Sequence, residues 1–398
     1  MTRRLRPSSA ERWINCPGSV RESEGMPNES SVYAMEGTAA HRLAEVCLTN
    51  QSDAGEFEGW RIFVKNSVAQ LAEPSANACP DGHHEFAVTS EMVEAVQFYL
   101  DTVRDFVEKG DDLHVEQFVE VPEIPDYGGT ADAIVVKNAA RRLVVADLKY
   151  GRGVVVDAEG NPQALTYADG ALRRFHNYDI AEVWVVIIQP RAEGNPVKTY
   201  KIDVLDLWDW KGELISAAKR TEAPDAPLVP GDWCKFCPAA PKCVALEQRV
   251  TSEIMADFSD TGDIILSDPP SINPERIARI LDNGGIIENW LARVRDYAHS
   301  LVESGKTIPG WKLVPKRAFR EWTDEGDVPQ NLSVMLGLTD DQIFERKLKS
   351  PAKIESTIGK KRKGEIAHLW ESVSSGTTLA PEADRRQEIQ TDPSSDFA

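Results

Sequence analysis

The sequence predicts an α/β protein with a mixed sheet, because helical and strand-like patterns alternate along its first part. Helical segments come first, then three segments in which apolar and polar residues alternate, then a helix and two further strands. The chain has 398 residues, of which 41% are hydrophobic, so it can bury the core of one large or two modest domains. We therefore expect a mixed central sheet flanked by helices, followed by a mainly helical C-terminal region.

Three helices are expected before the first strand. The first begins after Ser8 or Ser9, either of which can cap it, and stops at the "CPG" turn. The second spans 36–49 and the third spans 89–109, where apolar residues recur at helical spacing. The intervening stretch 50–84 shows no clear periodicity.

The period then changes from helical to two, which indicates strands. In chain order we expect strands at 113–122, 128–136 and 141–151, a helix at 161–175, strands at 182–190 and 197–203, and a helix at 203–220. The first three strands follow one another closely, so consecutive antiparallel pairing is the economical arrangement. Asn161 is the expected N-cap of the helix between strands, with Pro162 at its first position.

Composition changes beyond about residue 250. The expected parts are a first domain at 1–248, a helical accessory region at 249–373 and a disordered tail at 374–398. Within the accessory region, Pro274 to Glu303 reads as a long helix interrupted by Gly284 and Gly285, and 308–322 reads as a hairpin or extended segment.

Charge and cysteine usage limit the class of protein. The formal net charge of −19 argues against a generic nucleic-acid coat, which is normally basic. No apolar run is long enough to span a bilayer, and the N-terminus lacks a secretory signal, so no membrane partner and a cytoplasmic location are expected. The six cysteines are clustered rather than spread at framework spacing, which favours a reducing compartment and a metal over disulfides.

Two neighbouring strands carry a candidate site. Side chains alternate across a strand, so Asp147 and Lys149 point to the same face as Leu143 and Val145. Asp132 can face them from the adjacent strand, and two carboxylates beside a lysine suit a hard divalent cation and a water to be deprotonated. A structural ion pair between Asp147 and Lys149 is the alternative interpretation of this pair taken alone.

Other polar side chains strengthen the metal interpretation. Gln163 and Tyr167 are four residues apart and so lie on one side of their helix. His41, in "EGTAAH", offers a third ligand, although a lone helical histidine is more often a packed residue.

The ordered set resembles the RecB-like branch of the PD-(D/E)XK nuclease superfamily, a restriction-endonuclease-like fold, over residues 8 to 245. The set comprises His41, "GGTAD" ending in Asp132, "DLK" with Asp147 and Lys149, and "QALTY" with Gln163 and Tyr167. The resemblance implies that His41, Asp132 and Asp147 hold Mg²⁺ or Mn²⁺. It implies that Lys149 positions or activates the attacking water, and that the Gln-x-x-x-Tyr helix supports the site and the DNA. The acid of the first strand is either Glu116 or Glu120 by spacing.

The segment "WCKFCPAAPKC" at 233–243 contains three cysteines, one fewer than a four-thiolate site needs. Spacing alone leaves structural Zn²⁺ and a [4Fe–4S] cluster equally open. Iron–sulfur members of the RecB-like branch, including the AddB subunit of bacterial recombination complexes and the CRISPR adaptation nuclease, carry one cysteine before the nuclease core and three after it. The resemblance thus implies a [4Fe–4S] cluster bound by Cys16, Cys234, Cys237 and Cys243.

Together these features predict a divalent-metal-dependent DNA nuclease. The resemblance implies an exonuclease of the phage recombination type, with DNA as substrate and a recombination, single-strand-binding or annealing protein as a possible class of partner. The competing hypothesis is a non-catalytic DNA-binding or scaffold protein that keeps the nuclease fold and the cysteine site.

Overall fold

The computed structural model describes most of the chain up to residue 313 and shorter stretches beyond it. The described residues are 5–26, 31–65, 67–75, 78–152, 154–192, 194–255, 274–313, 328–336 and 339–344, with separate positions at 354, 362, 365 and 367–369. The chain divides into two compact units, Met1–Ala318 and Phe319–Ala398. The predicted domain boundary after residue 248 falls inside the first unit.

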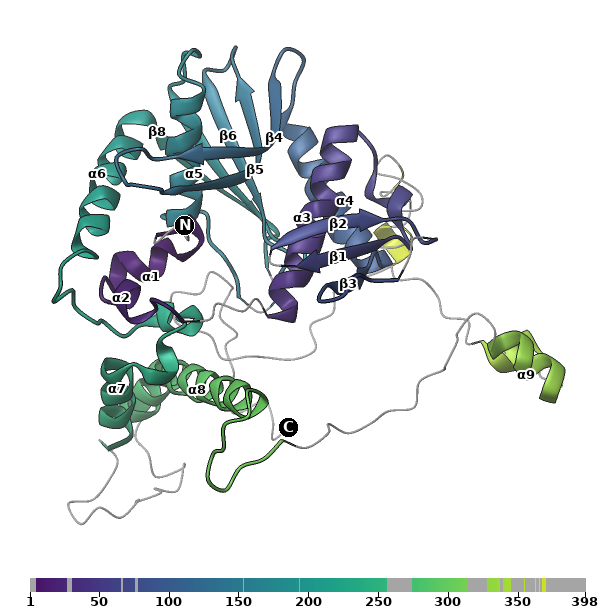
Figure 1. The fold of residues 1–398 in the computed structure, drawn as a ribbon. Helices are drawn as coiled ribbons and strands as arrows, with labels where there is room; N and C mark the ends of the chain where they lie inside the picture. The colour runs from purple at the N-terminus through teal and green to yellow at the C-terminus, as the bar shows by residue number, and fades with distance from the viewer. Residues whose placement is uncertain are drawn as a thin grey trace, which may run out of the picture. The chain divides into compact units, whose positions relative to one another are not determined.

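A five-stranded mixed sheet forms the centre of the first unit (Figure 1). Its strands, in spatial as well as chain order, are β4 (Asp112–Glu120), β5 (Gly128–Lys137), β6 (Arg142–Leu148), β7 (Glu182–Ile188) and β8 (Val197–Asp203). The pairs β4–β5, β5–β6 and β7–β8 are antiparallel, whereas β6–β7 is parallel. The parallel pair requires a crossover, which helix α5 (Pro162–Arg174) supplies. The predicted α/β class and the run of three antiparallel strands are therefore confirmed.

The two faces of this sheet bury separate apolar cores. Val144, Ala146 and Leu148 of β6 belong to the core shared with α3 (Val32–Asn50) and α4 (Ser90–Phe106). Leu143 and Val145 belong to the opposite core, which contains α5 and Leu207 of α6 (Val204–Arg220). This division confirms the predicted alternation along β6 and makes the sheet the middle of three layers.

A second, three-stranded sheet lies in the stretch that showed no periodicity. It has the antiparallel order β2-β1-β3, with β1 at Arg61–Lys65, β2 at Val68–Ala72 and β3 at His84–Ala87. Ile62 and Val64 of β1 are fully buried in the core that also contains α3 and α4. Figure 1 shows this small sheet beside those two helices.

The helices agree with the sequence in most positions, and Asn161 caps α5 as predicted by accepting a hydrogen bond from Ala164 N at 3.1 Å. Helix α1 (Ala10–Asn15) follows Ser9, but the Ser9 hydroxyl donates backwards to Arg6 O, so the predicted side-chain cap is absent. Helix α3 begins four residues before the predicted start because Ser31 caps it, accepting from Ala34 N at 3.2 Å. A short helix, α2 (Ser19–Glu22), was not predicted.

Beyond the sheet, the described residues of the first unit form two further α-helices, α7 (Val244–Met255) and α8 (Pro274–Glu303). Helix α8 continues through Gly284 and Gly285, so the predicted interruption is wrong: glycine lowers helix propensity by about 1 kcal/mol without preventing the backbone conformation. Of the predicted hairpin at 308–322, residues up to 313 are described and form one bridge, Ile308 to Trp311.

The described residues of the second unit form two α-helices, α9 (Val328–Leu336) and α10 (Asp340–Ile343), which pack against each other, and a 3₁₀ turn at Ala367–Leu369. The predicted tail at 374–398 lies outside the described residues. None of the described helices combines the length and apolar character that crossing a membrane requires.

Candidate functional site

Side chains from α3, β4 and β5 converge on one point. The ligand atoms of His41, Glu116 and Asp132 all lie within 4.8 Å of one another, and no other group of this kind occurs among the described residues. His41 Nδ1 lies 3.2 Å from Asp132 Oδ1. Adjacent ligands of an octahedral divalent cation, with bonds of about 2.1 Å, are separated by about 3 Å, so this spacing suits a shared cation.

The register of the first strand pair decides which acid joins the group. Val115 lies opposite Ala133 and Gln117 lies opposite Ala131, which places Glu116 opposite Asp132. Glu116 has a positive φ of 50°, a left-handed conformation that is strained for a non-glycine residue and that distorts the strand locally. Glu120 instead lies opposite Gly128 and is exposed. Of the two acids that the sequence left open, Glu116 is therefore the one that lies near Asp132.

The three ionisable groups control one another's charge. Burial lowers the pKa of His41, but the charge of Asp132 and the hydrogen bond to it raise this pKa to about 9. Burial and the charge of Asp132 together raise the pKa of Glu116 to about 8. Burial also opposes ionisation of Asp132, yet His41 and a hydrogen bond donated by Leu148 N at 2.7 Å hold its pKa below the ordinary value. The group therefore disfavours a second negative charge unless a cation is present.

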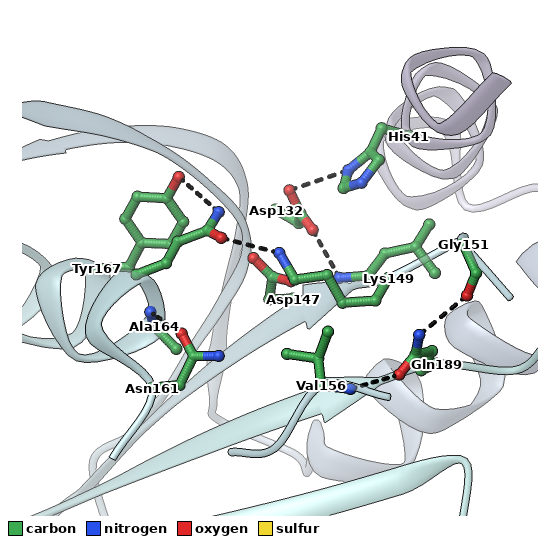
Figure 2. A network of polar contacts seen from close by, with 12 residues as sticks. His41, Asp132, Asp147, Lys149, Gly151, Val156, Asn161, Ala164, Tyr167 and Gln189 are labelled. Carbon is green, nitrogen blue, oxygen red and sulfur yellow. Dashed lines mark hydrogen bonds and ion pairs between the residues drawn. The ribbon is translucent and has the colours of Figure 1, made fainter. Parts of the chain in front are cut away.

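A chain of polar contacts runs from Asp147 into α5. Lys149 Nζ lies 2.8 Å from Asp147 Oδ2 and donates to Gln163 Oε1 at 3.0 Å. Gln163 Nε2 then donates to the Tyr167 hydroxyl at 3.2 Å. Figure 2 shows Asp132 between His41 and this chain. Burial raises the pKa of Asp147 above its ordinary value, although the Lys149 charge opposes that shift.

A glycine allows α5 to approach the strand that carries Asp132. A Cβ atom on Gly129 would lie 2.8 Å from Tyr167 Cε1, closer than real contacts permit, so any side chain here would push Tyr167 away. Gly129 in β5 thus permits the close packing of Tyr167, and Tyr167 accepts the hydrogen bond that orients Gln163.

The structure brings all six residues predicted for this site, His41, Asp132, Asp147, Lys149, Gln163 and Tyr167, into one region, but it separates them into two sets. His41 and Asp132 join Glu116 in the compact group, whereas Asp147, predicted as a metal ligand, is not among its three members and pairs with Lys149. Tyr99 was missed. Its buried hydroxyl has no hydrogen-bond partner among the described residues, and burial with the charges of Asp132, Asp147 and Glu116 raises its pKa. Its helical spacing indicated only a core residue.

A buried glutamine holds the loop that follows the Asp147–Lys149 strand. Gln189 is 4% exposed and donates to Gly151 O at 2.9 Å and to Val154 O at 2.7 Å. It also accepts from Val156 N at 3.0 Å (Figure 2). One side chain therefore fixes the backbone between Lys149 and α5. No local pattern predicts this role, because Gln189 lies more than thirty residues along the chain from the groups it contacts.

The four predicted cysteines form the second site. Cys16, Cys234, Cys237 and Cys243 all line one cavity, whereas Cys47 is buried in the core with α3 and Cys79 lies in a loop. Backbone N–H groups point to two of the sulfurs: Val229 N lies 3.2 Å from Cys16 Sγ and Gly231 N lies 3.5 Å from Cys234 Sγ. The structure therefore brings together the one early and three late cysteines.

The chemistry of these sulfurs suits metal ligation. Burial raises the pKa of Cys16, and it raises the pKa of Cys234 to about 11, so both are neutral thiols without a cation nearby. Arg12 Nη1 lies 3.9 Å from Cys237 Sγ, so a cationic side chain borders the sulfurs. N–H donors around sulfurs are typical of metal–thiolate sites, where they support the charge of the ligands.

Close packing fixes the approach of the two cysteine segments. Gly18 N donates to Pro227 O at 2.9 Å, and a Cβ on Gly18 would lie 2.5 Å from Ala226 O. On the other side, α8 covers the segment with Ile286, Ile287 and Trp290, in a cluster that contains Cys237. The cysteine segment thus contacts both the N-terminal helices and α8.

Fold and site together define an α/β protein with a candidate divalent-metal group at its mixed sheet. It also has a four-cysteine cavity, which is formed by residues that come before and after the sheet in the chain. A family model described as "Protein of unknown function (DUF2800)" matches residues 3–387. The chain belongs to this DUF2800 family.

Proposed function

We propose that this protein is a divalent-metal-dependent DNA nuclease with a PD-(D/E)XK core of the RecB-like type. The observation that carries the proposal is the meeting of His41, Glu116 and Asp132 with the Asp147–Lys149 pair at one place on the sheet. The mixed sheet entered through helices also agrees with the fold that the resemblance implies. The motif similarity further favours an exonuclease acting in recombination or repair.

The donor set fits a hard divalent cation. Two carboxylates and one imidazole would hold Mg²⁺ or Mn²⁺, and the nitrogen donor makes Mn²⁺ at least as suitable as Mg²⁺. The raised pKa of Glu116, caused by burial and by Asp132, marks a place where a cation would relieve repulsion. A cation bound here would polarise a phosphodiester and lower the pKa of a bound water.

Lys149 is placed to assist the attacking water or the phosphate. An ammonium group has three N–H donors, and Lys149 donates one of them to Gln163 Oε1 while its charge pairs with Asp147. A further N–H can donate to a water or to a phosphate oxygen that gains negative charge in the transition state. The contacts to Asp147 and Gln163 hold the ammonium in one position, so little reorganisation is required when charge develops.

The four cysteines are proposed to hold a [4Fe–4S] cluster. A tetrahedral Zn²⁺ site with bonds of about 2.3 Å places its sulfurs about 3.8 Å apart. No three of these cysteine sulfurs lie within 4.8 Å of one another, a wider spacing that favours a larger group. Structural Zn²⁺ is the alternative occupant.

The test is cleavage of labelled linear DNA by the purified full-length protein with Mn²⁺ or Mg²⁺. We expect products with either cation, none with EDTA, and none from Asp132→Asn, while Asp209→Asn, an exposed control on α6, stays active. A protein that binds DNA but releases no product under any of these conditions is a scaffold, and the proposal is then wrong. Blunt, overhanging and single-stranded substrates labelled at either end determine mode and polarity.

A further inference from the structure

A largely buried arginine connects the helix that carries His41 to the segment directly after β6, which carries Lys149. Arg191 follows β7 and its side chain is only 12% exposed. Its guanidinium carbon lies 4.1 Å from the centre of the Tyr150 ring, and Tyr150 is the residue after Lys149. The same guanidinium lies 3.5 Å from Glu36 Oε1 in α3 and donates to Glu91 Oε1 in α4 at 3.1 Å. One side chain thus joins three elements around the site.

Arg191 contacts helix α3 near its N-terminal end. Val32 and Tyr33 in the first turn are 59% and 83% exposed, and of the apolar side chains of this turn Met35 reaches the core. Glu36 lies between this exposed turn and His41, five residues further along. The ion pair with Arg191 is therefore a fixed point for the half of α3 that leads to the metal group.

We propose that Arg191 is a positioning residue, which sets the distance of His41 from Asp132 and Glu116 and thereby the affinity of the site for a divalent cation. The inference rests on the proposed metal site. A lysine does not replace the arginine, because only the planar guanidinium contacts two carboxylates and an aromatic face at once. Loss of an outer residue that orients a ligand typically lowers metal affinity 10- to 100-fold.

The experiment measures Mn²⁺ binding to the full-length protein without DNA, by electron paramagnetic resonance and calorimetry. Arg191→Met should weaken Mn²⁺ binding about tenfold, and Arg191→Lys should recover only part of this loss. Glu36→Gln is a milder variant that breaks the α3 contact alone, and it should weaken binding in the same direction. The matched control is Arg152→Met, since Arg152 also pairs with Glu91 but is 58% exposed.

A second background separates positioning from general stability. In His41→Ala protein, Arg191→Met should cause no further loss of Mn²⁺ affinity, because its effect acts through His41. An equal loss in both backgrounds, or no loss in either, overturns the inference. Wild-type protein that binds no Mn²⁺ removes the metal site and the inference together. Wild-type protein that binds Mn²⁺ but cuts no DNA removes only the nuclease function, and the Arg191 comparison still decides the inference.

Discussion

The group of His41, Glu116 and Asp132 and the four-cysteine cavity differ in how their buried ionisable groups affect the metal-free fold. Burial and the charge of Asp132 raise the pKa of Glu116 to about 8, so ionisation of Glu116 destabilises the metal-free fold. The buried thiols of Cys16 and Cys234 are neutral without a metal and repel nothing. Neutralising Glu116 should therefore stabilise the metal-free protein, whereas removing a cysteine should destabilise a protein that holds the proposed cluster. The carboxyl group of Glu116 costs the metal-free fold stability, and the proposed cluster would add to it.

The largest expected effect is on catalysis. Asp132→Asn should lower divalent-dependent DNA cleavage by about three orders of magnitude or more, because Asp132 contacts both His41 and the backbone at Leu148. The melting temperature should fall by only a few degrees, because the asparagine loses the charge that faces His41 but keeps a side-chain oxygen that can accept from Leu148 N. Single-turnover assays with circular dichroism melts measure both. Cleavage at the wild-type rate would place the chemistry elsewhere.

The next effect concerns Lys149. Lys149→Met should slow cleavage about 100-fold while Mn²⁺ affinity stays near the wild-type value, because the ammonium is proposed to act on the water rather than on the cation. Lys149→Arg should rescue poorly, since a planar fork does not fit the place between Asp147 and Gln163. A parallel fall of metal or DNA affinity would make Lys149 a binding group instead.

Loss of a cysteine from the four-cysteine site should lower the stability of the protein. A cluster that joins Cys16 to the cysteines beyond residue 233 closes a loop of more than two hundred residues, so its loss should lower the melting temperature by on the order of 10 °C. Cys16→Ser should also remove the brown colour and the iron of protein purified without oxygen. Cys79→Ser is the control, and it should keep both. Full iron content in Cys16→Ser, or stoichiometric zinc in the wild type, would refute the cluster.

The smallest expected effect is a gain in stability rather than a loss. Glu116 has a pKa of about 8 in the folded protein, above its ordinary value of 4.5. Between pH 4.5 and about pH 8, Glu116 is ionised in the unfolded chain but still protonated in the folded protein. The stability of the metal-free fold therefore falls as the pH rises through this range. Glu116→Gln should therefore raise the melting temperature of protein freed of divalent cations by about 3 °C at pH 8, and by less at pH 5.

Glu120→Gln is the matched control for this change, because Glu120 is the exposed acid that spacing alone did not exclude. It should leave the melting temperature unchanged at both pH values. Added Mn²⁺ should stabilise the wild type and the Glu120 variant but not the Glu116 variant. Stabilisation of all three by Mn²⁺ would remove Glu116 from the metal group.

The two sites also differ in how well the sequence predicted them. Alternation along β6 placed Asp147 and Lys149 on one face, and the spacing of Gln163 and Tyr167 placed them on one side of α5. Strand register depends on contacts between segments that are distant in the chain, so the sequence does not show whether Glu116 or Glu120 lies near Asp132. The pairing of Val115 with Ala133 in the structure identifies Glu116. For the cysteines, spacing identified three ligands, and only the resemblance pointed to Cys16.

Elsewhere the sequence failed for local reasons. The small sheet was not predicted because β1, β2 and β3 have only four or five residues each, too few to show a period. The contacts of Arg191 and Gln189 connect segments far apart in sequence, so no local pattern indicates them. Tertiary packing, rather than propensity, also carries α8 through its two glycines.

The meeting of Cys16 with Cys243 has a consequence for the order in which the protein is made. A ribosome adds about 5–20 residues per second, so about 10 to 45 s separate the synthesis of these two residues. During that interval α1 and α2 lack the chain around Pro227 on which Gly18 rests. The first segment to be synthesised is therefore among the last to reach its final place, and the four-cysteine cavity is complete only after residue 243 has emerged.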